Sequence, residues 1–397
     1  MGTVRLIHTS DWHLGRSFHQ VGLLGAQAAY LDSLVEVVRT ERVDAVLVSG
    51  DVYDRAMPSP ETVELLSQAL VRLVDAGAQV VVSSGNHDSA IRLGFAADLL
   101  ERAGLHVRTS VADIGRPVVV GDVAVHPLPY LEPALAADAL GAADRTHAGV
   151  VRAAMARVRA DAGRRGGRTV VMAHAFVLGG MTSESERDIS VGGVSGVPPE
   201  VFAGVDYTAL GHLHGRQEVA PGVRYSGSPV PMSFSEWRHR KGSLLVDLSG
   251  REPVVEHVEA PVERPLAVLR GTLAELLADP SHAHAEGAWC QVTLTDAVRP
   301  LGAMDSVRRR FPHTLELRFD PEGAAVQLRP YAARVATSSD VEVCCDFLGH
   351  VRAGRGASDD ERELLGEALE AARVARQLGD DEGVAGTPPQ PGSVGAA

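Results

Sequence analysis

Five short apolar runs within residues 1–214 each lead directly into a cluster of Asp, His or Asn side chains. The runs are rich in Val, Leu and Ile and show little alternation with polar residues, a pattern that predicts buried strands. In α/β sheets, ligand sites gather at the carboxyl ends of the strands, so we expect the clusters to converge on one rim. The clusters are Asp11-x-His13, Gly50-Asp51-x-x-Asp54, Gly85-Asn86-His87-Asp88, His174 and Gly211-His212-x-His214.

The order of strand-like and helix-like segments predicts a layered α/β domain over residues 1–260. Helical periodicity covers about 24–41, 60–75 and 143–161, and Pro60 stands at a favourable first-turn position. The strand candidates are 4–9, 45–49, 79–83, 118–126, 169–173, 207–210, 223–226 and 243–247.

Three further segments follow the main domain. Residues 261–335 alternate strand and helix patterns, which predicts a small α/β domain. Residues 336–379 predict a pair of amphipathic helices, because Ser-x-x-Glu capping boxes begin at Ser339 and Ser358 and a glycine stands at the end. Residues 380–397 are rich in Pro, Gly and polar side chains, so we expect a disordered tail.

The composition is that of a globular protein and excludes several other classes. Hydrophobic residues make up 45% and charged residues 22% of the 397 residues. Three cysteines cannot form a disulfide framework, which favours a reducing compartment. The chain has no uninterrupted apolar stretch of about 18 residues, and its start has no apolar signal-peptide core. We therefore expect a cytoplasmic protein without a membrane contact.

The predicted rim carries a donor set suited to metal ions. Two carboxylates, four imidazoles and one amide oxygen exceed the needs of one ion but suit two, if one carboxylate bridges them. Imidazoles mixed with carboxylates favour Mn²⁺, Fe or Zn²⁺ over Ca²⁺ or Mg²⁺. Two divalent ions keep a net positive charge against two carboxylates, so they attract an anion such as phosphate. His87 is then free to donate a proton, with Asp54 orienting it. The candidate metal ligands are Asp11, His13, Asp51, Asn86, His174, His212 and His214.

The net charge of -13 does not exclude a nucleic-acid substrate. Nine of the acidic residues lie between Asp359 and Glu382, close to the end of the chain. An acidic protein can act on a polyanion when bound metal ions supply the positive charge. Arginine provides nearly all of the basic charge, since Lys241 is the only lysine in the sequence.

The five clusters resemble the five motifs of the calcineurin-like metallophosphoesterase superfamily, over residues 4 to about 240. The resemblance implies a two-sheet sandwich flanked by helices. It also implies that His87 is the catalytic histidine and Asp54 the aspartate of its dyad. One implied metal takes Asp11, His13, Asp51 and His214, and the other takes Asp51, Asn86, His174 and His212, with Asp51 bridging.

Longer strings resemble the SbcD family of bacterial nuclease subunits over most of the chain. They are HTSDWHLGR, SGDVYDRAMPSP, VSSGNHDSA, YTALGHLH and RYSGSPVPMSFSE. This resemblance implies a Mn²⁺-dependent phosphodiesterase of DNA repair and recombination, an exonuclease on duplex ends and an endonuclease on single strands and hairpins. It implies a capping, DNA-contacting role for the small domain. It also implies that the helix pair binds an SbcC-like ATPase with a coiled coil, in a complex with two copies of each chain.

Other residues are weaker candidates. Arg16 and His19 follow the first motif, either as contacts to a phosphate backbone or as ordinary surface residues. The run Arg308, Arg309 and Arg310 is either a DNA contact or a solvated helix face. Apolar residues on the C-terminal helices favour partner binding over packing on the chain's own core. They include Leu348, Val351, Leu365 and Leu369.

Two other functions stay open. The same chemistry could serve small phosphodiesters or phosphomonoesters, but such substrates need neither a second domain nor a helix pair. A non-catalytic scaffold on the same fold is disfavoured, because every ligand position and His87 are present.

Overall fold

The computed structural model describes residues 3–186, 196–321, 339–352 and 355–381. The chain divides into two compact units. The first contains residues 1–268, 283–291 and 313–316, and the second contains 269–282, 292–312 and 317–397. The expected domain boundary near residue 260 stays a prediction.

The first unit is built on two six-stranded sheets. In the first sheet, β1, β4, β5 and β6 run parallel, and β13 pairs antiparallel with β1. The order of this sheet is β14 (Val254–Glu259), β13 (Gly242–Asp247), β1 (Arg5–Thr9), β4 (Ala45–Ser49), β5 (Gln79–Ser83) and β6 (Leu105–Arg108). Every residue of β4 is buried, as its unbroken apolar run predicts for a central parallel strand.

The second sheet has a parallel centre and antiparallel edges. Its order is β11 (Gln217–Ala220), β12 (Val223–Tyr225), β10 (Tyr207–Gly211), β9 (Arg168–His174), β8 (Val123–Pro127) and β7 (Val118–Val120). The strands expected around 118–126 form a hairpin of β7 and β8, because the chain turns at Gly121 with a φ of 59°. Glycine adopts this left-handed conformation without a Cβ clash.

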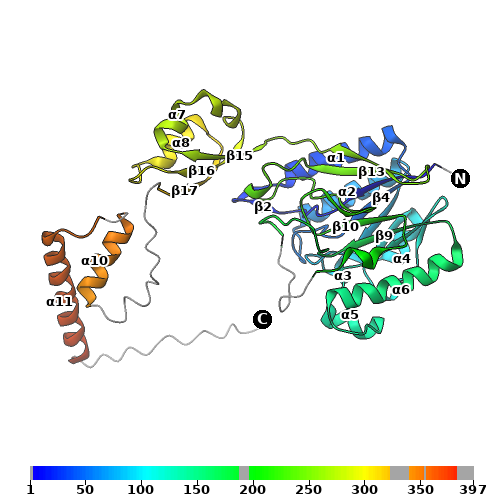
Figure 1. Ribbon diagram of the computed structural model, residues 1–397, viewed down its shortest axis with the longest axis horizontal. Coiled ribbons are helices and arrows are strands. Elements are labelled where there is room, and N and C mark those ends of the chain that lie inside the picture. Colours follow the sequence, from blue (N-terminus) through cyan, green and yellow to red (C-terminus); the bar gives the residue numbers. More distant parts are fainter. Residues whose placement is uncertain (1–2, 187–195, 322–338, 353–354, 382–397) are drawn as a thin grey trace, which may run out of the picture. The chain divides into compact units, whose positions relative to one another are not determined.

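Helices cover the outer faces of both sheets. Figure 1 shows α1 (Leu24–Glu41) and α2 (Pro60–Asp75) over the first sheet, and α5 (Pro133–Leu140) and α6 (His147–Arg165) over the second. The Ser59 side chain accepts from the Thr62 amide and caps α2, as an N-cap serine should. Apolar side chains of β1, β4 and β5 face those of β8, β9 and β10 in the core between the sheets. The predicted two-sheet sandwich flanked by helices is confirmed.

Several elements of this unit lie outside the sequence prediction. They are α5, the short helices α3 (Ala90–Leu93) and α4 (Ala97–Leu100), and the two-stranded hairpin of β2 (Ser17–Phe18) and β3 (Val21–Gly22), besides β6, β11 and β14. The helix expected at 143–161 begins four residues later, because Thr146 is its N-cap and accepts from the Gly149 amide.

A small three-stranded sheet follows, in the order β15 (Leu266–Gly271), β16 (Trp289–Leu294) and β17 (Thr314–Phe319). Helices α7 (Leu273–Ala278) and α8 (Ala303–Arg310) alternate with these strands, as the sequence predicts. Thr272 and Glu275 form a reciprocal capping box at the start of α7.

The helix pair is also present. Helix α10 covers Asp340–Val351 and α11 covers Asp359–Asp381, and both predicted capping boxes form, at Ser339 and Ser358. The expected stop at Gly379 is wrong, because α11 continues to Asp381. Within the pair, Leu348, Leu365 and Leu369 are half-buried and Val351 is exposed. Most of the expected disordered tail, from residue 382 onward, lies outside the described residues.

Candidate metal centre

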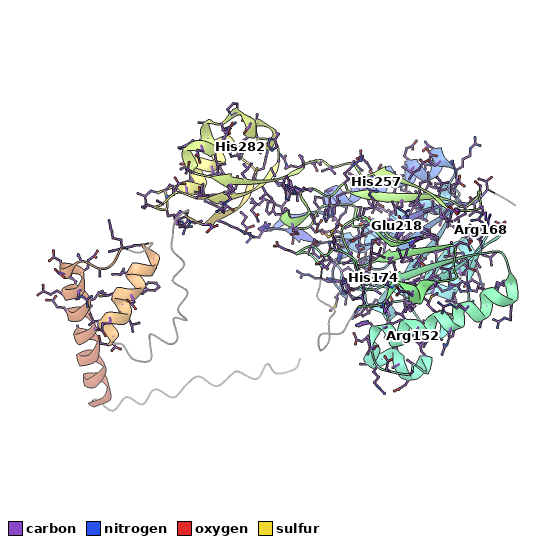
Figure 2. All side chains as sticks on the ribbon, viewed as in Figure 1. Arg152, Arg168, His174, Glu218, His257 and His282 are labelled. Atoms are coloured by element: carbon purple, nitrogen blue, oxygen red, sulfur yellow. The ribbon has the colours of Figure 1, made fainter. Side chains whose placement is uncertain are left out.

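The predicted ligands converge at the carboxyl ends of strands from both sheets. Asp11 and His13 follow β1, Asp51 follows β4 and Asn86 follows β5. The second sheet contributes His174, the last residue of β9 (labelled in Figure 2), and the two histidines that follow β10. All six carboxylate and imidazole ligands are buried and Asn86 is half-buried. The sequence expectation of one shared rim is met.

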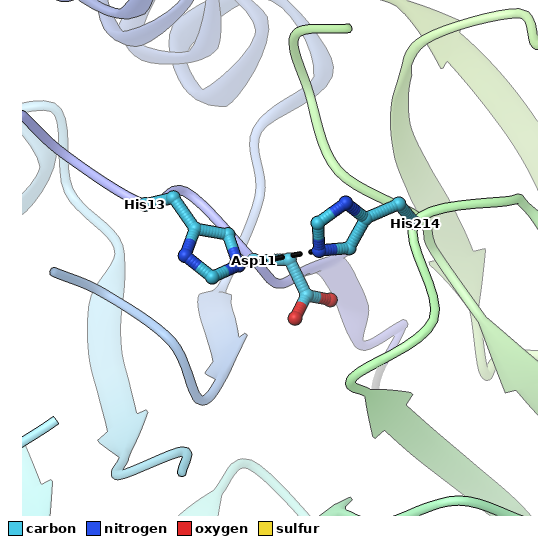
Figure 3. A group of neighbouring side chains, drawn as sticks. All are labelled: Asp11, His13 and His214. Carbon is cyan, nitrogen blue, oxygen red and sulfur yellow. Dashed lines mark hydrogen bonds between the residues drawn. The ribbon is translucent and has the colours of Figure 1, made fainter. Parts of the chain in front are cut away.

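Asp11, His13 and His214 form one group of candidate ligands. Their ligand atoms all lie within 4.8 Å of one another. Nε2 of His13 is 3.2 Å from Nε2 of His214, and Figure 3 shows the two rings pointing toward one another with the Asp11 carboxylate beside them. Both Asp11 oxygens also accept from the main-chain amide of His212, at 3.0 and 3.1 Å, which fixes the plane of the carboxylate.

A second group contains Asp11, Asp51 and His174. Nε2 of His174 lies 2.9 Å from Oδ1 of Asn86 and 3.4 Å from Oδ2 of Asp51. The same Asp51 oxygen lies 3.5 Å from Nε2 of His13, so it stands between the two groups. The His212 ring packs edge-on against the His174 ring, with centroids 5.4 Å apart.

The backbone at the rim is held in uncommon conformations. Asp11, His13, Asp51 and His212 have positive φ values of 53°, 43°, 50° and 107°. Such residues persist only where surrounding structure holds them, and they cluster at functional sites. Gly85 allows the turns after β4 and β5 to meet, because a Cβ at this position would lie 2.1 Å from Oδ1 of Asp51.

In the metal-free centre, burial and neighbouring charges shift the pKa values of two imidazoles in opposite directions. Burial alone would lower the pKa of His174, but the carboxylates of Asp51 and Asp11 outweigh burial and raise this pKa to about 9. Burial lowers the pKa of His212 to about 3, and the neighbouring His174 adds to the effect. The carboxyl of Asp51 loses solvation, yet nearby His174 and His13 hold its pKa well below the usual range. The imidazole of His174 thus stabilises the ionised carboxylate of Asp51 between the two groups.

These donors fit divalent cations. Imidazole nitrogens held 3.2 Å apart beside carboxylates are an arrangement that a shared cation stabilises. The Nδ2 atom of Asn86 is buried without a hydrogen-bond partner among the described residues, while its Oδ1 faces the His174 ring. The residues therefore suit two adjacent ions of the Mn²⁺, Fe or Zn²⁺ type.

The candidate proton donor lies next to this rim. The His87 ring packs edge-on against the His13 ring, with centroids 4.6 Å apart, and its Nδ1 lies 2.8 Å from the main-chain oxygen of Asp54. The Asp54 carboxylate instead binds Arg16 at 3.1 Å and lies 3.4 Å from Nδ1 of His13. The hydrogen bond from the His87 ring to Asp54 is therefore made to the peptide carbonyl, where sequence reasoning expected the side chain.

The weaker candidates make contacts within the chain. Arg16 binds Asp54 and also donates to the Ser185 carbonyl oxygen at 3.0 Å. His19 lies 3.7 Å from Glu316. In α8, Arg309 donates to Ser306 and Arg310 donates to the Leu276 carbonyl oxygen; Arg308 is exposed.

Sequence reasoning missed the residues that hold the ligands in place. Asp88 accepts from the amides of Val52, Tyr53 and Gly85, and so ties the turn after β4 to the turn after β5. Burial and the neighbouring Asp51 raise the pKa of Asp88 to about 6. Its position inside the Gly-Asn-His-Asp cluster was the only signal available. Four residues surround His214: Ser185, Glu186, Glu236 and Lys241. Glu236 ends the string RYSGSPVPMSFSE, and the other three lie outside the strings that carry the resemblance.

Two family models match the chain. Calcineurin-like phosphoesterase matches residues 4–125, and the type 5 capsule protein repressor C-terminal domain matches residues 262–352. Within the described helices, none is long and apolar enough to cross a membrane.

Individual proteins are also similar to the chain. The chain is 28% identical to the SbcD subunit of nuclease SbcCD from Staphylococcus saprophyticus over 319 residues, which covers 79% of this chain and 84% of the relative. Among solved structures, TT1561 of Thermus thermophilus is 13% identical, with 64% of this chain and 99% of that chain covered and a TM-score of 0.39. The calcineurin-like phosphoesterase YfkN of Bacillus subtilis is 12% identical, with 64% and 90% covered and a TM-score of 0.33. The chain is thus similar to the SbcD subunit of nuclease SbcCD and matches the calcineurin-like phosphoesterase model over its first part, which supports a metal-dependent phosphodiester hydrolase as its enzyme class.

Proposed function

We propose that this chain is a two-metal DNA nuclease, an exonuclease on duplex ends and an endonuclease on single strands and hairpins, which works with an SbcC-like ATPase. The observation that carries the proposal is the Asp51 carboxylate, whose Oδ2 lies 3.5 Å from His13 and 3.4 Å from His174. A carboxylate between two ligand groups is the arrangement that a pair of adjacent ions requires.

The ligand assignment follows the two groups. Bound divalent ions, Mn²⁺ in our proposal, would polarise a phosphodiester and make hydroxide available near neutral pH. One ion would be held by Asp11, His13, Asp51 and His214, and the other by Asp51, Asn86, His174 and His212.

His87 supplies a protonatable nitrogen at the edge of the site. Its Nδ1 faces a carbonyl oxygen, which can only accept, so Nδ1 carries a proton and Nε2 is the atom directed to chemistry. When the ring is protonated on Nε2 as well, the imidazolium can donate that proton to a leaving alkoxide, such as the sugar oxygen of a cleaved strand, and Nδ1 keeps its own proton. Arg16 neutralises the Asp54 carboxylate beside it and so limits repulsion of a phosphate.

Partner binding and location complete the proposal. Phe347, Val351 and Leu364 expose 53%, 64% and 64% of their surface on the helix pair. Such side chains on two amphipathic helices suit an apolar groove or a coiled-coil surface of the ATPase. All three cysteines are free, as expected for a cytoplasmic protein that meets DNA.

The test is cleavage by the purified full chain, with and without its ATPase partner, in Mn²⁺, Mg²⁺ or EDTA. Substrates are a blunt duplex, a hairpin and a chromogenic small diester. We expect cleavage of both DNAs in Mn²⁺, none in EDTA, and longer digestion with partner and ATP. The variant His87→Gln is the matched control, because it keeps the metal ligands and should remove cleavage.

Other outcomes separate the alternatives. The metal-loaded chain could hydrolyse the small diester and leave all DNA intact, even with its partner. That result would contradict the nuclease and favour an enzyme that acts on small phosphoesters. A chain that binds no divalent ion and hydrolyses nothing would favour the scaffold.

A further inference from the structure

The only lysine in the sequence, Lys241, is buried beside the candidate metal centre. It lies at the start of the segment that leads into β13, and just 5% of its surface is exposed. Lysine is almost never fully buried unless it is paired, and Arg is used at all other basic positions. Because this chain otherwise uses arginine, we infer that the surroundings of residue 241 specifically require an ammonium group.

The Lys241 ammonium has three N–H donors of its own, and three acceptors surround it. It forms an ion pair with the buried carboxylate of Glu236, and it donates to Oγ of Ser228 at 2.8 Å and to the carbonyl oxygen of His214 at 3.1 Å. Arg presents a planar fork of donors on a longer side chain, whereas an ammonium aims three N–H groups from one atom. The compact geometry suits three acceptors that surround one point.

The partner carboxylate reaches the side chain of His214. Oε1 of Glu236 accepts a hydrogen bond from Oγ of Ser185, and Oγ of Ser185 lies 2.7 Å from Nδ1 of His214. The same Oε1 lies 3.4 Å from Nδ1 directly. An ionised carboxylate can only accept, so the Ser185 hydroxyl must donate to it and accept from the Nδ1 proton of His214.

The main-chain polar atoms of His214 are also held. Its amide donates to Glu186 at 2.8 Å, and its carbonyl oxygen accepts from Ser228 as well as from Lys241. Gly227 permits this approach, since a Cβ there would lie 2.7 Å from the His214 carbonyl oxygen. Nε2 is the ring atom that remains for a metal, and it faces Nε2 of His13.

We propose that Glu236 and Lys241 are a positioning pair for the metal centre, which keeps the proton of His214 on Nδ1 and presents Nε2 as a ligand. The inference rests on the proposed function only in that His214 binds a metal ion. Lys241 pairs with Oε2 of Glu236 and leaves Oε1 to accept from the Ser185 hydroxyl. Contacts of this kind to a ligating histidine commonly change metal affinity by about 10- to 100-fold.

The decisive experiment is calorimetric titration of the metal-free full chain with Mn²⁺. In the double variant Glu236→Met with Lys241→Met, both charges are removed together, so no unpaired charge stays buried. We expect one of the two ions to bind about 10- to 100-fold more weakly, while the other keeps its wild-type affinity. The single variant Glu236→Gln preserves side-chain shape, and we expect a change in the same direction, because an amide can turn a donor toward Ser185.

A matched control removes another buried cation with its partner. Arg108 donates to Glu101 at 3.0 Å, and the double variant Arg108→Met with Glu101→Met should leave both Mn²⁺ affinities unchanged. Selective ¹⁵N labelling of lysine gives a single ammonium signal, which we expect to be protected from hydrogen exchange in the wild type and exposed in Glu236→Gln.

The outcomes separate the inference from the function on which it rests. If either Glu236 variant melts at a lower temperature but binds both ions as the wild type does, the pair is structural and the inference is wrong. An ammonium signal that exchanges as fast as free lysine in the wild type also overturns it. If the wild type binds no divalent ion, the proposed function fails, and the inference fails with it.

Discussion

Metal binding by this chain should release a proton from His174 and strengthen steeply as the pH rises. The neighbouring carboxylates of Asp51 and Asp11 outweigh burial and raise the pKa of His174 to about 9 in the metal-free centre. Its Nδ1 donates to the Ser49 carbonyl oxygen at 3.0 Å, so Nε2 is the atom that would bind the ion and must first lose its proton.

The size of the effect on metal affinity follows from the difference between the pH and the pKa of His174. At pH 7 the imidazole of His174 lies about two pH units below its titration, so about 1% of it is neutral, which weakens apparent affinity about 100-fold, or about 3 kcal/mol. Apparent affinity should therefore rise about tenfold per pH unit from pH 6 and level off near pH 9. His212 adds no further proton, because burial lowers its pKa to about 3.

Calorimetry in two buffers of different ionisation enthalpy measures the proton count directly. We expect about one proton released per His174-bound ion at pH 7. The variant His174→Asn keeps an oxygen ligand without the titrating group, so it should bind more weakly and with a nearly flat pH profile. A wild-type chain that binds Mn²⁺ equally well at pH 6 and pH 9, without proton release, would refute this reasoning.

Three substitutions test other parts of the centre. Asp51→Ala should remove both metals and all hydrolysis, because its carboxylate stands between the two groups; metal analysis after gel filtration measures this, and retention of two ions would contradict it. His87→Gln should keep both metals and lower hydrolysis by about 10²- to 10⁴-fold, which steady-state rates measure; unchanged rates would exclude it as the proton donor. Gly85→Ala should lose metal and lower the melting temperature, since its Cβ would lie 2.1 Å from Asp51; an unchanged melting curve and metal content would contradict the close approach.

The convergence of the candidate ligands was predictable because local sequence and fold geometry carry the same information. Each ligand lies directly after an apolar strand run, and parallel strands bring their carboxyl ends to one edge. The limits of β4, β5, α1 and α2 match the expected ranges residue for residue, and in α2 the Ser59 cap and Pro60 mark the start. Edge strands such as β14 were missed because their partly exposed residues lack a strong apolar pattern.

The support around the ligands was not predictable from local patterns. Glu236 ends the string RYSGSPVPMSFSE, but only packing places it against Ser185, 51 residues earlier in the chain. The sequence was equally unable to show which group of Asp54 contacts His87, where the side chain was expected to orient the ring. Spacing placed Asp54 near His87, but only the fold shows that its carbonyl oxygen faces His87 while its carboxylate binds Arg16.

Closure of the sandwich and formation of the metal centre depend on the same contacts. Near the ligands, polar groups bond from one sheet to the other: Ser49 donates to the Ala209 carbonyl oxygen at 2.9 Å, and its own carbonyl oxygen accepts from His174. His8 adds a contact to the Leu210 carbonyl oxygen at 3.0 Å. Buried hydrogen bonds of this kind are costly to leave unpaired, so they fix how the two sheets meet. Since one of these bonds also sets which nitrogen of His174 faces Asp51, the packing of the sheets determines the geometry of the ligands.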